Sequence, residues 1–265
     1  MTATKTLGVT FMTDVLDNHF YPKFLTKQWS SEKNSFVTRN YISQRYPKAK
    51  MTDKKSIRSV LYRTGAYNQD TEIFTANDDS IFAERVRELH TRNQEHDIDA
   101  MGQVLTDNVM RQLLYKLLLR QPSLNNSIIR AALSELQRQP YLLSAANNPF
   151  ITPSQDTLFK FEQWANTALF ASTPDRGDYD KFCYRLLVNC THTPFILSDD
   201  TKPERLILSL SPTMMMHYVF KSSFKTSHTA PDARIDFITT DEDIARYNSA
   251  LKQNCDAYYI STSAL

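Results

Sequence analysis

The chain has 265 residues, of which 41% are hydrophobic and 23% charged, and its 31 basic and 29 acidic side chains give a formal net charge of +2. A chain of this length and composition folds around its own core without needing a disulfide framework or a structural metal. The near balance of charge excludes a general electrostatic attraction for nucleic acid, so any polyanion site must be local.

The first predicted elements are extended. Residues 17–75 combine the runs "FLTKQW" and "FVTRNYIS" with the polar turn "SSEKNS" between them. Aromatic and β-branched residues on both sides of a polar turn are typical of a β-hairpin. The sequence therefore predicts an N-terminal hairpin region before the first helix.

Central helices are predicted from residue 78 onwards. "DDSIFAERVRELHTRN" opens with capping residues, and "DAMGQVLTDNVMRQLLYKLLLRQP" keeps a broad apolar face until Pro122. A third helix follows Ser123 and stops at Pro140, and a fourth, around "QDTLFKFEQWANTALFA", ends before Pro174. Periodic apolar residues between caps and prolines are the standard signals of amphipathic helices.

The last third of the chain consists of short β-rich runs, "YRLLVNC", "PFILSD", "RLILSLS", "MHYVF" and "RIDFITT". They predict one small antiparallel or mixed sheet. A final helix over "TDEDIARYNSALKQNCDA", capped by threonine or aspartate, precedes the closing strand "YYIST". The fold class expected is α+β, as a single domain over 1–265 with a possible internal boundary near 174–180.

Several kinds of protein are excluded by what the sequence lacks. Its four glycines stand alone, so neither GxGxxG nor GxxxxGK[ST] occurs. Three cysteines without CxxC spacing indicate a reduced compartment. No signal-peptide pattern and no apolar run of about 18 residues occurs, which predicts a cytoplasmic protein without a membrane partner.

A basic stretch lies between residues 45 and 63. Its cations, interleaved with Tyr46 and Tyr62, suit contacts with phosphates and bases, although a solvated loop has the same composition. The candidate nucleic-acid-binding residues are Arg45, Lys48, Lys50, Lys54, Lys55, Arg58 and Arg63.

Familiar catalytic patterns receive little support. Glu-x-Lys, which a restriction-type metal nuclease needs, is absent, and the histidines show no HExxH spacing. Arg85 and His90 have the Arg-x4-His spacing of HEPN-type ribonucleases, but the predicted sheet is foreign to that all-helical fold. No cofactor is expected, and a divalent metal remains possible without a motif that supports it.

Five segments taken in order resemble the bacterial family of unknown function DUF4238: "NHFYPKFLTKQW", "LLRQP", "PFILSDD", "LSLSP" and "ARYNSALKQNCDAYYIS". The resemblance covers nearly the whole chain. Gln121 stands where threonine is usual, and Asp200-Thr201 replaces the usual Asn-Pro. The matching polar residues are Asn18, His19, Arg120, Ser198, Asp199, Asn248 and Gln253, with Pro22 shaping the first motif.

The resemblance implies one shared site built from His19, Arg120, Asp199 and Asn248. A histidine beside an aspartate can transfer protons, and an arginine can stabilise a developing phosphate anion. The alternative is that Asp199 and Asn248 anchor the N-terminal hairpin against the sheet by hydrogen bonds.

Two functions follow from these two interpretations. The first is a bacterial or phage-borne nuclease or phosphodiesterase that acts on RNA or DNA in antiviral defence, with His/Asp acid–base chemistry. The second is a non-catalytic binding or regulatory subunit of a larger assembly, which would act through a protein partner.

Overall fold

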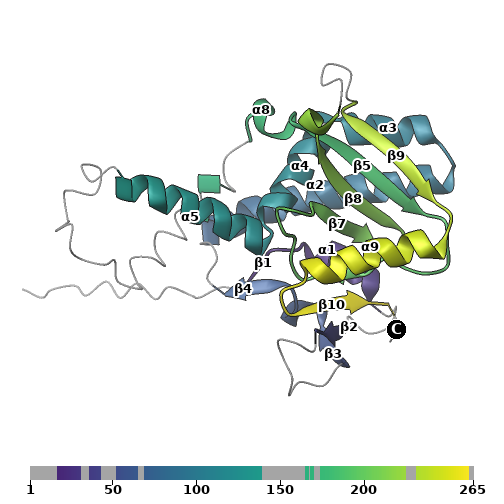
Figure 1. Cartoon of the computed structure of the whole chain (residues 1–265), viewed down its shortest axis with the longest axis horizontal. Coiled ribbons are helices and arrows are strands. Elements are labelled where there is room, and N and C mark those ends of the chain that lie inside the picture. The colour runs from purple at the N-terminus through teal and green to yellow at the C-terminus, as the bar shows by residue number, and fades with distance from the viewer. Residues whose placement is uncertain are drawn as a thin grey trace, which may run out of the picture.

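A computed structural model of the chain confirms the α+β class (Figure 1). It describes residues 17–30, 36–42, 52–64, 69–138, 165–166, 168–169, 174–224 and 231–262. Of the predicted elements, the helix around residues 155–171 falls almost entirely outside this part of the chain.

The larger part of the core is organised by a mixed four-stranded sheet of order β7-β8-β5-β9. Its strands are β5 (Phe182–Asn189), β7 (Ile207–Ser211), β8 (Met214–Phe220) and β9 (Ala233–Ile238). β5 pairs antiparallel with β8 and parallel with β9, and β7 pairs antiparallel with β8. These strands confirm the C-terminal sheet predicted from the sequence.

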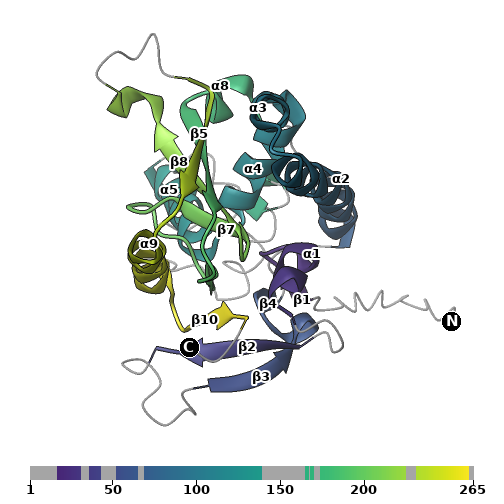
Figure 2. The same ribbon diagram turned by 90° about the vertical axis from the view of Figure 1, so that its right-hand side faces the viewer.

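Helices cover both faces of this sheet. Successive side chains of a strand point to opposite faces, so neighbouring residues belong to different clusters. Leu186 and Met216 belong to a cluster shared with the helices α2 (Gln69–Gln94), α3 (Ile98–Thr106) and α4 (Asn108–Leu119). Leu187 and Met215 belong to a second cluster with Ile244 and Leu251 of α9 (Asp241–Asn254). Figure 2 shows the resulting layers, with α9 on one side of the sheet and α2, α3 and α4 on the other.

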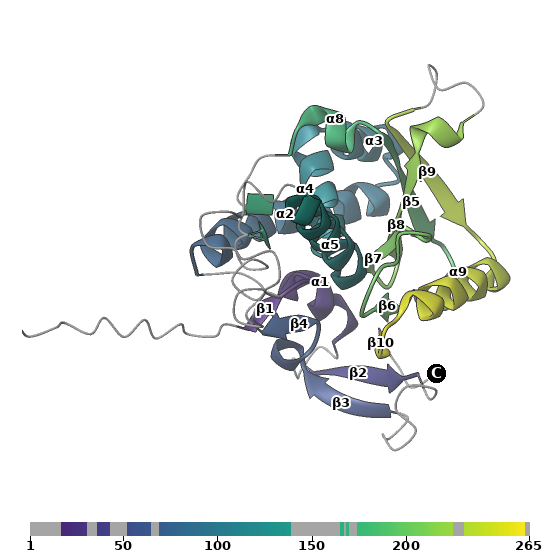
Figure 3. The ribbon, with the colours of Figure 1, turned by 60° about the vertical axis from the view of Figure 1, so that its left-hand side comes forward.

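A second four-stranded sheet of order β3-β2-β10-β6 lies below the first (Figure 3). It contains β2 (Phe36–Tyr41), β3 (Thr52–Ser56), β6 (Leu197–Ser198) and β10 (Tyr258–Ser261). The predicted strand at "PFILSD" therefore joins the second sheet and not the first. The N-terminal hairpin is formed by β2 and β3, and residues 42–51 connect them.

The prediction that "FLTKQW" is a strand is wrong. After β1 (Asp17–His19), the chain forms the helix α1 (Lys23–Thr26) and a 3₁₀ turn at Lys27–Trp29. Tyr21, Leu25 and Trp29 are buried at intervals of four residues, which is a helical spacing. The Trp29 indole donates to the Phe195 carbonyl oxygen at 2.8 Å, and the Tyr21 hydroxyl donates to that of Ser209. This segment therefore docks against the mixed sheet.

The central helices differ from prediction at their ends. α2 (Gln69–Gln94) begins before residue 78, and the predicted long helix is divided into α3 (Ile98–Thr106) and α4 (Asn108–Leu119). Asp107 divides them because it leaves the helical conformation and accepts a hydrogen bond from the Met110 amide as the cap of α4. Pro122 opens α5 (Pro122–Arg138), a position where its missing N–H costs nothing.

The remaining described elements are short. β4 (Tyr62–Thr64) pairs antiparallel with β1, and α8 (Arg176–Tyr179) precedes β5. No helix among the described residues is long and apolar enough to cross a membrane.

Candidate functional site

A pocket of about 320 Å³ lies between the N-terminal segment and helix α2. His19, Lys23 and Phe24 form one wall, where β1 turns into α1. Pro22 precedes the first turn of α1, so its ring fixes the turn between His19 and Lys23. The histidine at the centre of the resemblance therefore lines a pocket.

The other wall is a single face of α2. Its residues recur at three- and four-residue intervals, as side chains on one helical face must. They are Glu72, Thr75, Ala76, Asp79, Ser80 and Ala83. The small residues of this face leave room for the pocket, and the two acidic residues give it negative charge.

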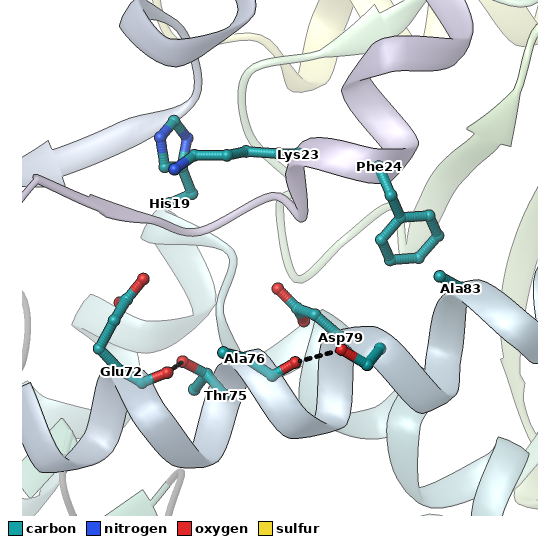
Figure 4. A pocket seen from close by; sticks show the side chains of 9 residues that line it. His19, Lys23, Phe24, Glu72, Thr75, Ala76, Asp79 and Ala83 are labelled. Atoms are coloured by element: carbon teal, nitrogen blue, oxygen red, sulfur yellow. Dashed lines mark hydrogen bonds between the residues drawn. The ribbon is translucent and has the colours of Figure 1, made fainter.

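Figure 4 shows how these side chains are directed. The Lys23 side chain extends toward the His19 ring, and the Glu72 and Asp79 carboxylates rise from α2 toward the segment that carries both. Phe24 points toward Ala83 at the other end of the pocket. Two nitrogen-bearing side chains thus face two carboxylates across one space.

Arg120 is connected to this wall by Asp79. Its Nη1 atom donates to Asp79 Oδ1 at 2.6 Å, and the arginine side chain is only 4% exposed. Burial raises the pKa of Asp79, while the charge and hydrogen bond of Arg120 act in the opposite direction. His19 and Arg120 therefore belong to the same region, with Asp79 between Arg120 and the pocket.

Glu72 is held by the residue next to His19. Asn18 Nδ2 donates to Glu72 Oε2 at 3.1 Å, and Asn18 is buried. This bond joins β1 to α2 at the edge of the pocket. The asparagine of the "NHFYP" motif thus orients a carboxylate that faces His19.

Asp199 lies elsewhere and binds backbone amides. Its carboxylate accepts hydrogen bonds from the amides of Asp256, Ala257 and Tyr258 at 2.7, 2.8 and 3.0 Å. These three residues connect α9 to β10. The carboxylate of Asp199 therefore holds this connection, and, in the ranges that the structure describes, its hydrogen bonds do not reach the N-terminal hairpin that the alternative interpretation expected it to anchor.

Asp199 has an unusual pKa for an aspartate. Burial raises its pKa to about 7, outweighing the amide donors that favour the carboxylate. A group whose pKa is raised on folding stabilises the fold below its unfolded pKa, about 3.9, and loses that contribution as pH rises through the folded pKa.

We therefore expect the stability difference between the native protein and Asp199→Ala to shrink as pH rises from about 4 to 7 and to stay constant above about 7. Urea denaturation at a series of pH values measures it. Glu204→Gln, at an exposed position of the turn that follows Asp199, is the matched control and should show no such trend. A difference that grows with pH would contradict the raised pKa.

Asn248 is also engaged by the backbone. Its Nδ2 donates to the Pro194 carbonyl at 3.0 Å, and its Oδ1 accepts from the Ile196 amide at 3.1 Å. The residue sits on α9 and holds the loop before β6. Asp200 has a comparable role, because it accepts from the Ser123 amide at 3.0 Å and from its hydroxyl at the start of α5.

The predicted nucleic-acid-binding residues fall into three groups. Lys54 and Arg58 are exposed, on β3 and the turn after it, and Lys55 is 47% exposed and 4.0 Å from Asp53. Arg63 lies in β4, opposite Asn18. Arg45, Lys48 and Lys50 lie outside the described residues.

Glu72 and Asp79 were missed by the sequence reasoning. The signal was present, since the acidic, small and hydroxyl residues of "TEIFTANDDSIFA" recur at helical intervals. The predicted extended region runs to residue 75 and so includes Glu72, and the helix predicted from residue 78 treats Asp79 only as a capping residue. Within the described part of the chain, no cluster of three or more His, Cys, Asp or Glu residues could hold a metal ion.

Comparisons with models of protein families, with curated proteins and with solved structures found no match. The resemblance to DUF4238 therefore stays a prediction.

Proposed function

We propose that the protein cleaves RNA by acid–base chemistry in the pocket between β1, α1 and α2. The observation that carries this proposal is that His19 and Lys23 face Glu72 across one pocket of about 320 Å³. A proton donor, a proton acceptor and a cation within one pocket are the groups that phosphodiester transfer requires.

Each group takes one role in the proposed step. Glu72 accepts the proton of a ribose 2′-hydroxyl, whose oxygen then attacks the adjacent phosphorus. The bond from phosphorus to the 5′-oxygen breaks, and the His19 imidazolium donates a proton to that leaving oxygen. Lys23 compensates the negative charge that develops on the phosphate oxygens. The products are a 2′,3′-cyclic phosphate and a free 5′-hydroxyl.

This proposal replaces Asp199 with Glu72 as the partner of His19. It keeps Arg120 as a positioning residue, because Arg120 does not itself line the pocket and its guanidinium contacts Asp79, which does. The exposed Lys54 and Arg58 supply further positive charge for the phosphates of a longer RNA. A bacterial or phage-borne, cytoplasmic protein of the DUF4238 family, acting in antiviral defence, is the setting that the resemblance suggests for this activity.

The test is incubation of the purified protein with labelled tRNA, mixed RNA, single-stranded DNA and duplex DNA, with magnesium, with manganese and with chelator. We expect RNA to be cleaved with or without chelator and DNA to be left intact, because DNA lacks the 2′-hydroxyl nucleophile. Cleavage of DNA, or cleavage that chelator abolishes, would replace this mechanism by a metal-assisted one.

The second candidate is a binding or regulatory subunit without catalysis. It is favoured by Asp199 and Asn248, whose polar atoms bind backbone groups around α9. Under this alternative no nucleic acid would be cleaved under any condition, and substitutions at both residues would reduce stability or partner binding together.

A further inference from the structure

Tyr62 is an exposed aromatic side chain directly beside the proposed catalytic histidine. It lies opposite His19 in the pairing of β1 with β4, and the two ring centroids are 6.0 Å apart. The tyrosine is 39% exposed, which is high for a large aromatic residue. It therefore offers a ring to solvent next to the pocket.

The backbone before Tyr62 is held in an uncommon conformation. Leu61 has a positive φ of 55°, which is costly for a residue with a branched side chain, and it is buried. Its amide donates to the Tyr258 hydroxyl at 3.0 Å, and its carbonyl accepts from the Phe20 amide at 3.2 Å. Contacts from two other segments thus stabilise a strained turn whose effect is to place Tyr62 opposite His19.

The charges around the pocket fit a phosphate next to this ring. Asp79 is paired with Arg120, and Glu72 accepts a hydrogen bond from Asn18, whereas Lys23 is exposed and has no acidic partner among the described residues. Lys23 also extends toward His19 (Figure 4). A phosphate between Lys23 and His19 would leave the attached nucleoside close to Tyr62.

We infer that the pocket takes one unpaired nucleotide of a single strand, with its base stacked on Tyr62. This inference rests on the proposed function and names its substrate class. The volume of about 320 Å³ is at the lower end of ligand pockets, which suits one nucleotide and not a base pair. Bases inside a duplex are already stacked and paired, so only an unpaired base can lie against the ring.

The experiment measures binding separately from cleavage. Fluorescence anisotropy is recorded with labelled 2′-O-methyl RNA, which lacks the nucleophile of the proposed step, as a single strand and as a duplex. Tyr62→Leu removes the ring but keeps an apolar side chain in β4, and Tyr62→Phe keeps the ring. Circular dichroism of both variants verifies that they fold.

We expect Tyr62→Leu to weaken single-strand binding roughly 5- to 100-fold, the loss that removal of one base–aromatic stack produces, and Tyr62→Phe to retain most of it. The native protein should bind the duplex more weakly than the single strand. Binding of the duplex should be equal in the native protein, Tyr62→Leu and Tyr62→Phe. Equal single-strand binding by the native protein and Tyr62→Leu, or no binding of the single strand, would overturn the inference. Because the probe cannot be cleaved, selective single-strand binding would support it even if natural RNA were never cleaved.

Discussion

His19→Gln and Glu72→Gln are each expected to reduce RNA cleavage by about 100- to 10,000-fold, the contribution of a positioned acid or base. Glutamine at position 19 cannot carry the proton that the leaving oxygen needs. Glutamine at position 72 still accepts the hydrogen bond from Asn18, but it does not take a proton from the 2′-hydroxyl. Both replacements preserve volume, so the melting temperature should fall by only a few degrees.

The measurement is the initial rate of cleavage of a labelled RNA, with the thermal midpoint recorded for each variant. His90→Gln is the matched control, since His90 is a partly buried histidine of α2 that does not line the pocket. It should keep full activity. Activity that persists in both His19→Gln and Glu72→Gln would remove the catalytic role from this pocket.

The double variant tests whether the two residues act in one step. When two groups serve the same transition state, removal of either one abolishes most of what the pair contributes, and the second substitution adds little. We therefore expect His19→Gln with Glu72→Gln to be about as inactive as the single variants. If the cleavage rate of the double variant instead fell by the product of the two single reductions, the two residues would act in separate steps.

The sequence predicted those parts of the fold whose signal is local. The strands of the mixed sheet are short β-rich runs, and Thr240 caps α9 by accepting a hydrogen bond from the Asp243 amide. By contrast, β6 joins the second sheet by pairing with β10, about 60 residues away in the chain. No local pattern distinguishes that pairing from membership of the first sheet.

The error at "FLTKQW" has a different origin. Aromatic and apolar residues here suggested a strand, but Tyr21, Leu25 and Trp29 are spaced for a helix that turns one side to the core. A helix this short depends on tertiary contacts for its stability. Here Tyr21 donates a hydrogen bond to the Ser209 carbonyl, and Trp29 donates one to the Phe195 carbonyl. Because the extended region was predicted to run to residue 75, the first helix was predicted to start only at residue 78. The first part of α2, with Glu72 on its acidic face, was therefore not recognised as helical.

The four predicted site residues divide between two regions. His19 lines the pocket, and Arg120 reaches its wall through Asp79. Asp199 binds backbone amides of the segment after α9, and Asn248, on α9, binds the backbone of the loop before β6. Sequence alone could not separate the two groups, because a carboxylate that binds three amides and a carboxylate that transfers a proton are the same residue type.

Asp199→Ala is expected to lower the free energy of unfolding by about 2–4 kcal/mol near neutral pH. The substitution leaves the amides of Asp256, Ala257 and Tyr258 without their acceptor, and a buried amide that loses its partner costs about 1–3 kcal/mol. Asp256 is exposed, so water can replace the carboxylate at that amide, and the total is smaller than three full penalties.

The corresponding fall in melting temperature is about 5–15 °C for a chain of this size. Thermal and urea unfolding measure it, with Glu204→Gln as the control that removes a carboxylate from an exposed position of the neighbouring turn. If Asp199→Ala instead unfolds like the native protein and loses all RNA cleavage, Asp199 would be a catalytic residue, and the four-residue site implied by the resemblance would replace the pocket of His19 and Glu72.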